Sequence, residues 1–113
     1  MASHSMKLQP VPFAQVKART KTIEMRLNDE KRQTIQAGDT LIFYKEPDLI
    51  ESITTRVVER LPYPTFREMV ASNPPLSMGF EGSIEAYMRP EFYSAEDEQR
   101  YGALGLRIEV MDV

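Results

Sequence analysis

One segment in the N-terminal quarter of the chain constrains the fold most, because charged side chains alternate there with apolar ones. A β-strand places successive side chains on opposite faces of a sheet. In a strand, Ile23, Met25 and Leu27 share an apolar face, while Glu24 and Arg26 share the other. The segment is therefore predicted to be a strand with one polar face that carries a carboxylate and a guanidinium.

Two interpretations of this polar face stay open. The first is a structural ion pair between Glu24 and Arg26, which on a surface contributes about 0–1 kcal/mol. The second is the floor of a polar site, because a guanidinium offers a planar fork to a phosphate or a base edge. Strict alternation turns Lys21 away from the pair. It can join them only if the strand begins after it, or if a bulge re-aims its side chain.

The composition limits the class of protein. A chain of 113 residues is about one domain, which we expect to span residues 1–113, with residues 1–5 partly disordered. There is no cysteine and one histidine, so thiolate and multi-histidine metal sites are excluded, and we expect no cofactor. No apolar run approaches ~18 residues and no secretory signal is visible, so we expect a cytoplasmic protein without a membrane span.

The charge is unevenly spread along the chain. The net charge of −3 argues against binding to long duplex DNA, whose affinity comes from many phosphate contacts. Residues 1–45 are nevertheless basic, with eight cationic against four acidic side chains. The cationic ones are Lys7, Lys17, Arg19, Lys21, Arg26, Lys31, Arg32 and Lys45, and the acidic ones are Glu24, Asp29, Glu30 and Asp39. A locally basic face suits a small anionic or nucleotide-like partner.

The remaining pattern predicts an α+β fold with about five strands and short helices between them. Turn and capping signals place the elements, among them a capping box that begins at Thr65 and a cap signature that begins at Ser94. Strands at both ends of a small chain favour a closed or nearly closed sheet, because closure removes exposed edges. The predicted strands are 5–9, 21–27, 40–45, 52–61 and 104–110, and the predicted helices begin near Pro12, Asn28 or Asp29, Thr65, Ser83 and Ser94.

Several short motifs, taken in order, resemble the ASCH superfamily. That family carries the motif Gly-x-Lys-x-x-Glu-x-Arg, which aligns with residues 19–26. Lys21, Glu24 and Arg26 match it, while Arg19 stands in the place of the glycine, so the turn into the strand is expected to differ. The Gly-Asp turn at 38–39 and the C-terminal stretch from Phe92 to Gly105 also look like the family, so the resemblance covers nearly the whole chain.

This resemblance implies a small PUA-like β-barrel with a cleft beside it. Lys21, Glu24 and Arg26 would line the cleft and face RNA, a nucleotide or a modified base. Tyr93 and Ser94 are further ligand-binding candidates, because Tyr93 precedes a helix start at Ser94 where free backbone N–H groups can bind an anion. The alternative is that Ser94 only caps that helix.

An enzymatic alternative follows from the same resemblance. Some small bacterial members of the superfamily are amidohydrolases that deacetylate acetylated cytidine with a lysine, a threonine and a glutamate. If this chain is such an enzyme, Lys21 would be the nucleophile or base and Glu24 the second catalytic candidate, although Glu24 stands where those enzymes have threonine. Glu81 and Glu85 are the candidates for their glutamate. A neighbouring carboxylate favours a charged lysine, so we expect Lys21 to bind phosphate rather than to attack as a neutral amine.

Overall fold

A computed structural model describes residues 1–80 and 93–111 of the chain. The helix predicted to begin at Ser83, together with Glu81 and Glu85, lies outside the described residues. The elements in chain order are β1 (Ser3–Leu8), α1 (Pro10–Lys17), β2 (Ile23–Leu27), α2 (Glu30–Gln33), β3 (Thr40–Lys45), β4 (Ser52–Tyr63), α3 (Phe66–Ser72), the 3₁₀ helix η1 (Pro75–Met78), α4 (Ala95–Tyr101) and β5 (Ala103–Val110).

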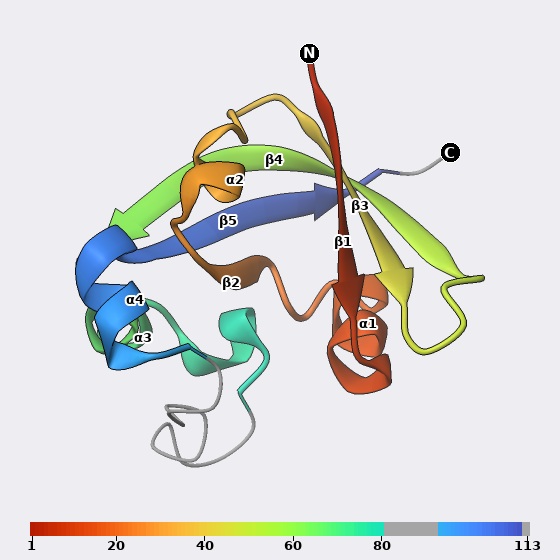
Figure 1. Cartoon of the computed structure of the whole chain (residues 1–113). Helices are drawn as coiled ribbons and strands as arrows, with labels where there is room; N and C mark the ends of the chain where they lie inside the picture. The colour runs from red at the N-terminus through yellow and green to blue at the C-terminus, as the bar shows by residue number, and fades with distance from the viewer. Residues whose placement is uncertain (81–92, 112–113) are drawn as a thin grey trace.

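The five strands form one curled sheet in the order β1-β3-β4-β5-β2, and the fold is α+β (Figure 1). β1 runs parallel to β3, and the other neighbouring strands are antiparallel. β1 and β2 are the edges and do not pair with each other. The sheet is thus a half-barrel consistent with a PUA-like fold, open between these two strands.

Two groups of buried apolar side chains hold the elements together. The first lies between the sheet and α1, and its fully buried members include Leu41, Phe43 and Val16. The second joins β2 to α3 and to the segment that follows it, through Ile23, Met69 and their neighbours. β2 and β5 contribute to the second group, so this part of the sheet is covered on both faces.

The local signals in the sequence correspond closely to the elements. β3 has the predicted bounds. Three predicted caps are formed, because Asp29, Thr65 and Ser94 each accept a hydrogen bond from the backbone N–H three residues later. The predicted end of β4 at Leu61 is wrong. Pro62 continues the strand opposite Leu104, because a proline still offers its carbonyl to a ladder.

The first residues of the chain pair with the sheet. β1 already begins at Ser3, whose partner in the parallel ladder is Thr40. His4 Nε2 lies 2.9 Å from Asp39 Oδ2, and the same carboxylate accepts the N–H of Ala2 and of Gln36. These contacts hold the first residues against the start of β3. Among the helices of the described residues, none is long and apolar enough to span a membrane.

Candidate functional site

The polar face of β2 points into the half-barrel. In the antiparallel ladder Glu24 lies opposite Leu106 and Arg26 lies opposite Leu104. Residues directly opposite each other share one face of a sheet, and both leucines belong to the first apolar group. The alternation seen in the sequence is therefore kept, and it buries Glu24 to 5% exposure.

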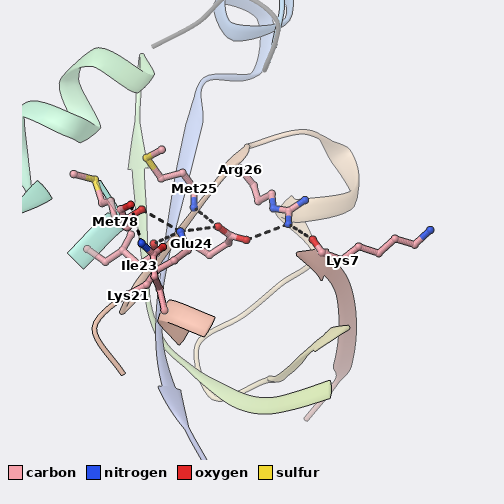
Figure 2. A network of polar contacts seen from close by, with 9 residues as sticks. Lys7, Lys21, Ile23, Glu24, Met25, Arg26 and Met78 are labelled. Atoms are coloured by element: carbon pink, nitrogen blue, oxygen red, sulfur yellow. Dashed lines mark hydrogen bonds and ion pairs between the residues drawn. The ribbon is translucent and has the colours of Figure 1, made fainter. Parts of the chain in front are cut away.

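Lys21 does join the pair, because β2 begins after it at Ile23. Its Nζ lies 3.1 Å from Glu24 Oε1 and donates to the carbonyl oxygens of Ile23 and Met78, each at 3.2 Å (Figure 2). An ammonium group has three hydrogens. The protein therefore offers one acceptor for each of them, in a setting where the Lys21 side chain is only 6% exposed.

Glu24 is the centre of this network. Oε1 accepts from the N–H of Met25 at 3.1 Å as well as from Lys21, and Oε2 accepts from Arg26 Nη2 at 3.1 Å. Burial by itself raises the pKa of Glu24, but the charges and hydrogen bonds of Lys21 and Arg26 outweigh it, and the pKa lies below its usual value. Glu24 is thus a buried carboxylate that stays ionised between two cations.

Arg26 connects the two open edges of the sheet. Its Nη2 also donates to the carbonyl oxygen of Lys7 on β1, at 2.9 Å (Figure 2). Burial lowers the pKa of Arg26, whereas Glu24 and then the hydroxyl of Tyr93 raise it further, so the balance is an increase. A charged side chain therefore spans the gap between β1 and β2, where a closed barrel would have ladder hydrogen bonds.

A cavity of about 700 Å³ opens beside this network, and we call it the first cavity. Lys21, Glu24 and Arg26 line it together with Tyr93 and Ser94, so all five predicted site residues lie around one space. The wall beyond the charged network is mainly apolar and aromatic. Its other members include Leu8, Val11, Met25, Phe66, Met78 and Phe80.

Tyr93 and Ser94 take different positions at this cavity. The Tyr93 ring stacks on Phe66, with centroids 5.2 Å apart and planes within 1°. Ser94 accepts the N–H of Asp97 and caps α4, a helix of seven residues. The described contacts of the Ser94 hydroxyl are those of a helix cap.

Two backbone groups at the site have no signal in the sequence. Lys7 contributes its backbone carbonyl, and a backbone acceptor is independent of residue type. Met78 contributes another carbonyl from the end of η1. The Pro74-Pro75 pair signals a break before η1, but only tertiary contact brings Met78 to Lys21.

The turn before β2 contains Arg19 where the family motif has glycine. Arg19 has φ of 67°, in the left-handed region that glycine enters without strain. Here the chain adopts this backbone conformation at an arginine. The result is the turn that returns the chain from α1 to β2 and sets Lys21 beside η1.

The lowered pKa of Glu24 predicts a loss of stability in acid. The unfolded carboxyl titrates near 4.5, so the unfolded chain takes up this proton first as the pH falls. The contribution of Glu24 to the free energy of unfolding is therefore complete above about pH 5 and declines as the pH falls through the folded-state pKa.

Urea unfolding measured from pH 7 to pH 3 tests this. The difference in the free energy of unfolding between wild type and Glu24→Gln should become smaller as the pH falls. A gap that stays constant with pH would contradict this. Glu109→Gln, in an exposed pair with Arg56, is the control.

The fold and the site together define a PUA-like α+β domain with a charged cleft. Comparison with protein families matches residues 6–112 to the ASCH domain, and the chain therefore belongs to this family. Membership of the ASCH family supports a general classification of this chain as an RNA-binding-like domain. No curated protein matches the chain significantly.

Two solved structures are similar over nearly the whole chain. The crystal structure of hypothetical protein PH0355 is 31% identical, covers 96% of this chain and 99% of its own, and has a TM-score of 0.85. The solution NMR structure of protein PF0455 from Pyrococcus furiosus is 32% identical, covers 98% and 99%, and has a TM-score of 0.74. Both similarities support the half-barrel architecture described above.

Proposed function

We propose that this domain binds single-stranded RNA or a nucleotide, with a base in the first cavity and the Arg26 guanidinium as the main polar contact. The observation that carries the proposal is an ionised arginine held between Glu24 and the Lys7 carbonyl in the wall of a largely apolar cavity. The hydrogen bonds to Glu24 and Lys7 both come from Nη2, the Tyr93 hydroxyl is a further partner, and a guanidinium has five N–H donors. The N–H groups of Nε and Nη1 that these partners leave over can face a base edge or a phosphate.

The wall of the first cavity supports a base rather than a fully polar ligand. A base has two apolar faces and a polar edge, and stacking on an aromatic ring contributes about 1–3 kcal/mol per base. The stacked pair of Phe66 and Tyr93 supplies aromatic surface, and Met25 and Met78 supply adaptable apolar surface. The connected network of Lys21, Glu24 and Arg26 supplies one polar edge to this wall, which fits a ligand with a polar edge of its own.

In this proposal Glu24 and Lys21 line the cleft but act mainly by fixing Arg26. Glu24 already accepts three hydrogen bonds of the roughly four that a carboxylate can accept. The hydrogens of Lys21 have acceptors within the protein, so a neutral, attacking amine would have to break that network. The geometry thus lends no support to the amidohydrolase alternative, whose glutamate candidates also lie outside the described residues.

The test is binding of short fluorescent single-stranded RNAs of mixed sequence, and of nucleotides in competition, at low salt. Arg26→Ala is expected to weaken binding by about tenfold or more, because an arginine that recognises a base edge contributes roughly 1–3 kcal/mol. Arg26→Lys keeps the charge but loses the planar fork, so it should recover only part of the affinity. Anisotropy titrations measure each dissociation constant.

Arg56→Ala is the matched control, because it also removes an ion-paired arginine. Arg56 pairs with Glu109 at 3.0 Å on an exposed part of the sheet, away from the first cavity. Thermal unfolding of each variant separates lost binding from lost folding. If the wild-type protein binds no RNA or nucleotide, or if Arg26→Ala binds as tightly as Arg56→Ala, the proposed function is wrong.

A further inference from the structure

A second cavity, of about 560 Å³, lies on the side of Arg26 that faces β1 and α2. Its lining differs in charge from that of the first cavity. Among the described residues that line it, four are lysine or arginine and none is acidic. These cations are Lys7, Arg26, Lys31 and Arg32. The first cavity, in contrast, has Glu24, Glu46 and Glu98 in its wall beside its cations.

The cations of the second cavity fall into two groups. Arg26 and Arg32 are held by carboxylates, at 3.1 Å from Glu24 and 2.7 Å from Asp29 respectively. Lys7 and Lys31 are exposed, and in the described part of the chain neither makes an ion pair. Two positioned guanidinium groups and two unpaired ammonium groups therefore surround one space. Such a lining suits a phosphate, which carries charge and several acceptor oxygens.

The two cavities meet at Arg26 and Lys7, which line both of them. Figure 2 shows the Arg26 guanidinium between the Glu24 carboxylate and the Lys7 carbonyl. From this juxtaposition we infer that the second cavity binds the phosphate groups that are joined to the base in the first cavity. The inference rests on the proposed function and deepens it, because it makes the ligand a phosphorylated nucleotide or an RNA strand rather than a free base or nucleoside.

Lys31→Gln is the test variant, because Lys31 lines only the second cavity and its exposed side chain has no ion pair to lose. Lys17→Gln is the matched control, since Lys17 is an exposed lysine that lines neither cavity. Loss of one phosphate contact should weaken binding of a single-stranded pentaribonucleotide about threefold and reduce the salt slope by about 0.7. The affinity of Lys31→Gln for an unphosphorylated nucleoside should equal that of the wild-type protein. If Lys31→Gln and Lys17→Gln bind the pentaribonucleotide with equal affinity and equal salt slope, the inference is overturned.

Amide chemical-shift mapping by NMR separates this inference from the proposed function. The nucleoside should shift amides near Met78, Gly79 and Tyr93 but not those of Lys31 and Arg32, whereas the pentaribonucleotide should also shift Lys31 and Arg32, which line only the second cavity. A nucleoside 5′-triphosphate that reproduces these added shifts would identify a mononucleotide as sufficient, and shifts with the pentaribonucleotide alone would identify an RNA strand. Pentaribonucleotide shifts confined to the first cavity would overturn the inference and leave the proposed function intact. Shifts confined to the second cavity would contradict the proposed base site, and no shifts at all would contradict both.

Discussion

Glu24→Ala is expected to lower the free energy of unfolding by about 3–5 kcal/mol, because it removes the carboxylate from a buried charged network. The mutation leaves Lys21 at 6% side-chain exposure, and Arg26 at 18%, without their shared anion. A buried charge without a counter-charge is far more costly than a lost surface ion pair. Denaturant unfolding at pH 7 measures the loss.

Two further variants define the origin of this loss. Glu109→Ala also removes a carboxylate that is paired with an arginine, because Glu109 lies 3.0 Å from Arg56, but this pair is exposed. It should change the free energy of unfolding by less than about 1 kcal/mol. Lys21→Met combined with Glu24→Ala should lose less than the sum of the two single variants, because the double variant no longer buries the lysine charge. Additive single effects would show that the network is not coupled and would contradict this account of the site.

Gly102→Ala should be the second strongly destabilising change. Gly102 ends α4 with φ of 74° and ψ of −176°, a backbone region essentially restricted to glycine. This conformation alone disfavours alanine by about 1–3 kcal/mol. A Cβ would also lie 2.9 Å from the carbonyl oxygen of Tyr63, whose backbone is fixed in the ladder with Ala103. The clash cannot be relieved by rotating a side chain.

Gly38→Ala is the matched control for this prediction. Gly38 has φ of 93°, but the nearest atoms to its Cβ would belong to the flexible Met1 side chain, at 3.5 Å or more. Gly38→Ala should therefore lose clearly less stability than Gly102→Ala, as measured by thermal or urea unfolding. Equal losses at the two glycines would mean that the contact with Tyr63 is not what restricts position 102.

Local patterns in the sequence predicted most of the secondary structure. β3, the caps at Thr65 and Ser94 and the faces of β2 depend on side-chain type and spacing within a few residues, so they are visible without a structure. The degree of sheet closure was harder to predict. Pairing between β1 and β3, and the gap between β1 and β2, depend on contacts between segments that are far apart in the sequence.

The site shows the same division. The alternation of charged and apolar residues in β2 by itself put Glu24 and Arg26 on one face. Whether Lys21 would join them depended on where the strand began, and the sequence left that open. The tertiary structure decided it, because η1 places the Met78 carbonyl where it accepts a hydrogen bond from the ammonium group. β1 likewise brings the Lys7 carbonyl to Arg26. Backbone acceptors have no signature in a sequence, so only the folded chain shows that this ion pair is a buried network between two cavities.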